Sequence, residues 1–169
     1  SASGMSRRLY DAAYAIIGRV QGGLASATVI GCGGFAALSG SSVASALTMG
    51  KVALAEMERF NYNTRLSTGV VAAGGTLGIL IPPSTGFVIY AILTEQSIGR
   101  LFLAGILPGL LLLTLFIVTI SIICWIRPEY GPKGPKTSWR QKGEAFLGAG
   151  PILLVILLTI GGIYGGVFS

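Results

Sequence analysis

The chain has 169 residues, of which 52% are apolar and only 11% are charged, and its formal net charge is +6. Soluble globular domains carry about 25% charged residues, so this composition excludes an ordinary soluble domain and predicts an all-α integral membrane protein. Histidine is absent, and the two cysteines, Cys32 and Cys124, are isolated in apolar runs, which argues against a metal centre or a disulfide framework.

Residues 1–19 predict an amphipathic helix that lies in the membrane interface as an arm. Apolar residues at helical spacing occupy one face, and charged residues surround it. The apolar set is Leu9, Ala12, Ala13, Ile16 and Ile17, and the charged set is Arg7, Arg8, Asp11 and Arg19. Such a helix contacts membrane lipid at its surface and does not cross the bilayer.

The segment 20–57 predicts a re-entrant helical hairpin. Its uncharged part, 20–50, has 31 residues and would span about 46 Å as one helix, against a hydrocarbon core of about 30 Å. Gly40, Ser41 and Ser42 interrupt this run near its middle, so two legs of about 15 residues can enter the membrane, turn and leave by the same face. The alternative is one long tilted helix whose small residues serve packing.

The segment 66–94 predicts a transmembrane helix that is discontinuous over 75–84. Pro82 and Pro83 remove two backbone donors and bias the preceding residues away from helical geometry. The carbonyls freed by the break cost several kcal/mol each in lipid unless they face protein or a polar cavity. A break at mid-membrane depth therefore indicates a binding site, as broken helices do in transporters.

The rest of the chain predicts two further membrane helices and one connecting loop. A helix rich in leucine and isoleucine is expected at 101–126, and a cytoplasmic basic loop with several glycines and prolines at 127–144. A second transmembrane helix is expected at 145–168, with Pro151 in its first turn.

The distribution of basic residues favours the hairpin over the long helix. If 20–57 is re-entrant, residues 1–19, the segment 51–65 and the loop 127–144 share one face. These regions hold eleven of the twelve basic residues, and the opposite face holds Arg100 alone. This asymmetry matches the positive-inside tendency, with the three regions in the cytoplasm of a multi-pass protein. Because topology explains the net charge, nucleic acid is not expected as a partner.

Two small-residue interruptions in neighbouring elements predict an ion and substrate site. Both offer hydroxyls and free carbonyls, which can hold a monovalent cation such as sodium, and helix N-termini that suit an anionic group. No acidic residue occurs in 12–55 or in 59–94, which disfavours a proton relay. The candidate set is Gly40, Ser41, Ser42, Gly75, Thr76, Pro82, Pro83 and Ser84, with sodium expected at Ser41, Ser42, Gly75 and Thr76.

Ser41 and Ser42 can cap a helix N-terminus, a role compatible with ion binding. Two other classes of function compete with transport, namely an intramembrane hydrolase and a membrane scaffold. An intramembrane hydrolase that used either serine as a nucleophile would need a base, and without histidine only Lys51 is available, where its leg leaves the membrane. A membrane scaffold without transport would need no paired breaks. We therefore expect no catalytic residue and no cofactor other than a coupling ion.

Several motifs taken together identify a family. They are Gly40-Ser41-Ser42, the run from Gly75 to Ser84, Tyr90, Ser97-Ile98-Gly99, the run from Leu101 to Gly105, and Pro108-Gly109. In this order they closely resemble the large membrane subunit of tripartite ATP-independent periplasmic (TRAP) transporters, the DctM-like permeases. The segment 51–56 departs from the family, which usually shows a more apolar stretch with a proline there.

The resemblance implies a sodium-driven symporter of the bacterial or archaeal inner membrane. Its substrates would be carboxylates such as C4-dicarboxylates or sialic acid, delivered by a periplasmic binding protein, and its membrane partner would be a small DctQ-like subunit. It also implies an elevator movement and two inverted repeats. By the same resemblance, the candidate residues would line one sodium site and one side of the substrate pocket. Since one repeat is found here, we expect the chain to supply half of a site that another segment completes.

Overall fold

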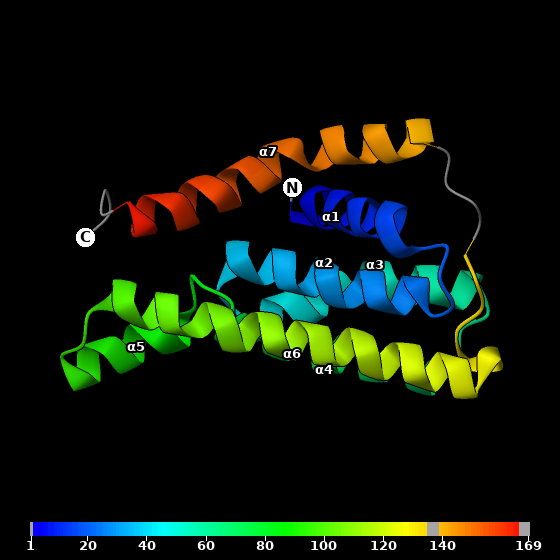
Figure 1. Ribbon diagram of the computed structural model, residues 1–169, viewed down its shortest axis with the longest axis horizontal. Coiled ribbons are helices and arrows are strands. Elements are labelled where there is room, and N and C mark those ends of the chain that lie inside the picture. The colour runs from blue at the N-terminus through cyan, green and yellow to red at the C-terminus, as the bar shows by residue number, and fades with distance from the viewer. Residues whose placement is uncertain (1, 135–138, 166–169) are drawn as a thin grey trace.

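The computed structural model describes residues 2–134 and 139–165, which form an elongated helical arrangement (Figure 1). Within these residues there is no strand, so the predicted all-helical class is confirmed. The helices in chain order are α1 (Ala2–Ile17), α2 (Gly23–Ser39), α3 (Ser42–Arg59), α4 (Thr64–Leu80), α5 (Thr85–Thr94), α6 (Ile98–Ile126) and α7 (Trp139–Tyr164), with a 3₁₀ turn η1 (Pro128–Tyr130) after α6.

Two stretches of the described residues are long and apolar enough to cross a membrane. One is Thr64–Thr94, which contains α4 and α5, and the other is Ile98–Ile126, which is α6. Large apolar side chains on these stretches face outward, and Leu93, Leu107 and Trp125 are each at least 77% exposed. Continuous apolar surface of this kind marks contact with lipid or with other protein. The composition and the helices together are those of a helical membrane protein.

Helices α2 and α3 run side by side in opposite directions and are joined by Gly40 and Ser41 alone (Figure 1). Helix α2 ends because Gly40 adopts the left-handed conformation, with φ at 60°, and its N–H donates to the Ala36 carbonyl at 2.8 Å. Helix α3 begins because the Ser41 hydroxyl accepts from the Ala44 N–H at 3.4 Å. The uncharged run 20–50 therefore contains two helices.

The chain is interrupted again between α4 and α5, over residues 81–84. The Ile81 N–H still donates to the Leu77 carbonyl at 2.9 Å, which closes the last turn of α4. Pro82 and Pro83 follow, and neither has an N–H with which to continue the helix. The interruption is shorter than the expected range 75–84, because residues 75–80 remain helical.

Helix α7 begins at Trp139, six residues before the start that the sequence predicted. Residues 139–144, expected in the basic loop, form its first turns, and an Arg140–Glu144 salt bridge of 3.3 Å spans one turn. Pro151 therefore lies in the helix interior and not in the first turn. Residues 135–138 of the expected loop and 166–168 of the expected helix lie outside the described residues.

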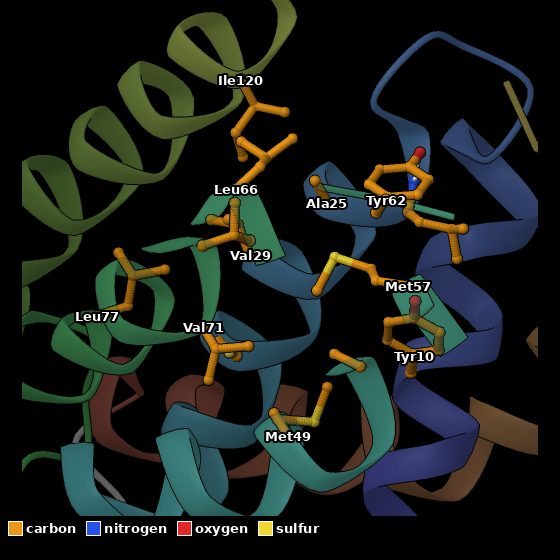
Figure 2. Close-up of a cluster of buried hydrophobic side chains, with 14 of the residues drawn as sticks. Tyr10, Ala25, Val29, Met49, Met57, Tyr62, Leu66, Val71, Leu77 and Ile120 are labelled. Carbon is orange, nitrogen blue, oxygen red and sulfur yellow. Dashed lines mark hydrogen bonds between the residues drawn. The ribbon is translucent and has the colours of Figure 1, made fainter. Parts of the chain in front are cut away.

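The core lies where five helices meet (Figure 2). Its buried residues include Tyr10 from α1, Val29 from α2, Met57 from α3, Leu66 from α4 and Ile120 from α6. Helix α1 contacts α2, α3 and α7, and Ala12 and Ala13 of its predicted apolar face are buried, whereas Ile16 of the same face is 53% exposed. Its position in the membrane interface stays a prediction.

The connections that follow α1, α3 and α6 meet at one end of the molecule, on the right of Figure 1. Three backbone hydrogen bonds hold them together. They run from the Gly22 N–H to the Gly131 carbonyl at 3.0 Å, from the Gly134 N–H to the Gly18 carbonyl at 3.1 Å, and from the Asn63 N–H to the Tyr130 carbonyl at 3.1 Å. The α2–α3 pair therefore starts and finishes at the same end.

Tyr62 joins these connections through its side chain. Its hydroxyl donates to the Pro132 carbonyl at 2.8 Å and accepts from the Leu24 N–H at 3.3 Å. Burial disfavours the phenolate and raises the pKa of Tyr62 to about 12, so the hydroxyl keeps its proton near neutral pH and can donate.

We expect Tyr62→Phe to lower the free energy of unfolding of the complete protein by about 1–3 kcal/mol, because it leaves a buried N–H and a carbonyl without a partner. Thermal melting in detergent measures the loss. Tyr90→Phe is the matched control, since the Tyr90 ring is 55% exposed on α5. Equal melting temperatures for the two variants would contradict the role given to Tyr62.

Candidate functional site

The turn between α2 and α3 lies against the interruption between α4 and α5 (Figure 1). We name this contact the junction, and it consists of residues 39–42 on one side and 81–85 on the other. The backbone N–H of Thr85 donates to the Gly40 carbonyl at 3.3 Å, and the Thr85 hydroxyl donates to the same oxygen at 3.1 Å. Two breaks that are distant in the sequence are thus joined directly.

Glycines make this close approach possible. A Cβ atom on Gly40 would lie 2.7 Å from the Pro83 carbonyl oxygen, and a Cβ atom on Gly78 would lie 2.8 Å from the Ser42 nitrogen. Neither position has room for a side chain, because both neighbouring atoms belong to the backbone. Helix α4 and the turn therefore contact each other through backbone atoms.

The turn also carries a cluster of serine hydroxyls. The Ser45 hydroxyl donates to the Ser41 carbonyl at 2.9 Å and lies 3.2 Å from the Ser39 hydroxyl. Ser39 and Ser45 were absent from the candidate set predicted from the sequence. The signal for Ser45 was its four-residue spacing from the helix cap Ser41, whereas Ser39 is the last residue of α2 and had no comparable signal.

Two hydroxyls of the junction are buried and have no hydrogen-bond partner within the described part of the chain. They belong to Ser42, at the start of α3, and to Ser84, which is 1% exposed. Buried polar atoms in native proteins are nearly always paired. These two oxygens are therefore available to a water molecule, an ion or a further protein segment.

The junction brings together N-terminal and C-terminal helix ends, whose dipoles carry partial charges of opposite sign. Helices α2 and α4 end there, and α3 and α5 begin there, so the junction holds carbonyls and N–H groups that have no partner within their own helix. The carbonyl ends favour a cation and the N–H ends favour an anion, by about 0.3–1 kcal/mol each. The sequence has no acidic residue in 12–55 or 59–94, so ligands from these segments are neutral oxygens.

Helix α6 covers the break from another side. A Cβ atom on Gly105 would lie 2.9 Å from the Leu80 carbonyl oxygen, so this glycine lets α6 pack over the end of α4. Phe87 and Phe102, with ring centroids 6.4 Å apart, hold α5 against α6. The end of α4 is therefore enclosed by the turn and by α6.

The structure brings most of the predicted site residues together. Gly40, Ser41, Ser42, Pro82, Pro83 and Ser84 lie in the junction. Gly75 lies within α4, where a Cβ atom would be 3.4 Å from the Ser42 carbonyl oxygen.

Thr76 points elsewhere, because it is exposed and its hydroxyl donates to the Ala73 carbonyl of its own helix at 2.6 Å. Besides Ser39 and Ser45, sequence reasoning left Gly78 and Thr85 out of the candidate set. Gly78 follows Gly75 at helical spacing, which was the available signal.

Comparison with known proteins identifies similar sequences along the whole chain. The family described as "Tripartite ATP-independent periplasmic transporter, DctM component" matches residues 1–169. The C4-dicarboxylate TRAP transporter large permease protein DctM of Pseudomonas aeruginosa is 45% identical over 166 residues, which are 98% of this chain and 38% of that protein.

The DctM protein of Vibrio cholerae serotype O1, which has the same description, is 41% identical over 169 residues, which are 100% of this chain and 37% of that protein. The sialic acid TRAP transporter large permease protein SiaM of the same organism is 32% identical over 169 residues, with 100% of this chain and 39% of that protein covered. The chain therefore spans less than half the length of these relatives.

Proposed function

This chain belongs to the family of TRAP transporter DctM components, and from that premise we propose that it forms part of a permease that takes up a small organic carboxylate together with sodium. Its relatives are named as transporter permeases, so the chain is a transporter component and not an enzyme. The observation that carries the proposal is the junction, where two helix breaks meet and two buried hydroxyls have no partner among the residues that the structure describes.

Sodium binds among the oxygen atoms of the junction. The carbonyl ends of α2 and α4 and the hydroxyls of Ser41 and Ser42 supply neutral oxygens, with further ligands from Gly75 and Thr76. The exposed position of Thr76 makes it the ligand that depends most on other segments of the permease.

The substrate binds at the same junction, against the N-terminal ends of α3 and α5. Their N–H groups attract a carboxylate, and the Ser84 hydroxyl provides one hydrogen bond. The relatives named for C4-dicarboxylates and for sialic acid support this class of substrate, since both compounds carry carboxylates.

The permease spans the inner membrane of a bacterium or archaeon several times. Helices α2 and α3 form the re-entrant hairpin, and the connections that carry most of the basic residues face the cytoplasm. The partners are a small DctQ-like subunit and a periplasmic binding protein, and a second inverted repeat completes the site. An elevator movement of the completed site carries the substrate across.

Uptake by the complete tripartite system in liposomes tests sodium coupling. Replacing sodium by potassium should reduce carboxylate uptake at least about tenfold, the effect of about 1.4 kcal/mol of coupling. Ser42→Ala should raise the sodium concentration for half-maximal uptake about fivefold, because one oxygen ligand is lost. Thr76→Ala tests ligation by the Thr76 hydroxyl with the same measurement.

The matched control is Ser121→Ala, which removes a hydroxyl that donates to the Ile117 carbonyl on the exposed side of α6. Its sodium dependence should equal that of the wild type. Uptake that persists without sodium would contradict the proposed coupling, and an unchanged sodium requirement in Ser42→Ala would contradict ligation by that side chain.

A further inference from the structure

A second feature of the molecule is a cavity of about 380 Å³ between α4 and α6. It lies toward the end where the basic connections meet, and Val29 of α2 and Tyr130 of η1 also line it. Its volume falls within the range of about 300–1,000 Å³ that is typical of ligand sites. Arg65 is its only charged lining residue within the described part of the chain.

The cavity is a groove that follows the helices. Its α4 wall extends from Arg65 to Ala73, which corresponds to about 12 Å along the helix axis. Gly69 faces this space, and a Cβ atom there would have no atom within 4 Å. The Thr119 hydroxyl on the α6 wall donates to the Leu115 carbonyl at 2.7 Å, so it is already paired. The body of the groove therefore suits an apolar chain.

The charged end of the groove holds two guanidinium groups. Arg65 lines the groove itself, and Arg127 donates to the Tyr130 hydroxyl at 2.9 Å, with its guanidinium carbon 5.3 Å from the centre of that ring. Both arginines are exposed, and no carboxylate forms a salt bridge with either of them in residues 2–134 and 139–165. Glu129 of η1 lies near this end, but within the described residues neither guanidinium is neutralised by a direct salt bridge.

We propose that the groove binds one acyl chain of an anionic phospholipid whose phosphate contacts Arg65 and Arg127. The walls are the two stretches of sequence that can cross a membrane, and the charged end lies with the basic connections. A phospholipid has an apolar acyl chain and a negatively charged phosphate at one end, which matches the apolar body and the charged end of the groove. A further protein helix would fill the apolar part alone, unless it placed a carboxylate beside the arginines.

Native mass spectrometry of the complete permease in detergent tests this proposal with two added lipids, phosphatidylglycerol and phosphatidylcholine. The wild type should retain phosphatidylglycerol about tenfold more than phosphatidylcholine. The double variant Arg65→Gln with Arg127→Gln should lose that preference. Gly69→Trp, which fills the groove, should reduce the retention of both lipids, and thermal melting confirms that each variant is folded.

The control is Arg100→Gln, which removes one positive charge near the start of α6, at the end of that helix away from Arg127 and outside the groove. It should retain phosphatidylglycerol as the wild type does. Equal retention of the two lipids by the wild type, or unchanged retention in the arginine variant, would overturn the proposal. A cross-link from Gly69→Cys to another protein segment would overturn it too. Because sodium and substrate are absent from the assay, its failure says nothing against transport.

Discussion

Gly78→Ala is expected to reduce the initial rate of carboxylate uptake by the complete permease about 5- to 150-fold, the factor that corresponds to 1–3 kcal/mol of overpacking. The added methyl group would lie 2.8 Å from the Ser42 nitrogen and 2.9 Å from the Ser42 Cα. Neither backbone atom can rotate away, so the turn between α2 and α3 has to move. That movement displaces the hydroxyls and helix ends on which the proposed ion binding depends.

The control for this experiment is the same substitution where space is open. A Cβ atom on Gly148 of α7 would have no atom within 4 Å. Alanine is favoured over glycine inside a helix by about 1 kcal/mol, so Gly148→Ala should keep or raise the melting temperature and leave uptake unchanged. Wild-type uptake by Gly78→Ala would show that the close contact between α4 and the turn is not needed.

Gly40→Ala is expected to reduce uptake at least about tenfold and to lower the melting temperature. Gly40 has a φ of 60°, and an alanine there costs about 1–2 kcal/mol. The methyl group would also lie 2.7 Å from the Pro83 carbonyl oxygen, which pushes the two breaks apart. The hydrogen bonds from Thr85 to the Gly40 carbonyl would lengthen as a result. Uptake assays and thermal melting of the same preparations measure both effects.

Gly40→Asn separates the two causes. Asparagine tolerates the left-handed conformation better than alanine, but its Cβ atom occupies the same position. If the contact with Pro83 dominates, Gly40→Asn should be as harmful as Gly40→Ala, whereas Gly148→Asn should have little effect. Recovery of uptake in Gly40→Asn would contradict the steric argument and leave backbone conformation as the only cause.

Local signals indicated an interruption at Gly40 and another at Pro82, although the second covers 81–84 and not the expected 75–84. A glycine followed by a capping serine ends one helix and starts the next, and consecutive prolines cannot continue a hydrogen-bonded ladder. The structure accordingly ends α2 at Ser39 and α4 at Leu80. The same local reasoning failed for α7, because Gly143 is the only weak helix former from Trp139 to Glu144, whereas the glycines and prolines that suggested a loop lie mostly before Trp139.

The direction of each side chain was harder to predict, since it depends on how the helices pack. Gly75 and Thr76 are neighbours in the sequence, but Gly75 faces α3 and Thr76 is exposed. The close contact of α4 with Ser42 determines which of the two faces the turn, and this contact is a feature of the tertiary structure. The apolar stripe on residues 1–19 was likewise visible, but periodicity does not reveal whether lipid or protein covers it.

The length of α2 determines what fraction of the membrane potential an ion crosses to reach the proposed site. Its 17 residues place the junction about 25 Å from the end where the basic connections meet, and the 12 residues from Ile98 to Gly109 in α6 extend about 16 Å beyond it. A monovalent cation that enters from the α5–α6 side would cross roughly 40% of that length. At 2.3 kcal/mol per 100 mV for the full membrane, the voltage would contribute on the order of 0.9 kcal/mol to its binding. Occupancy of the site should therefore vary with membrane potential before any substrate moves.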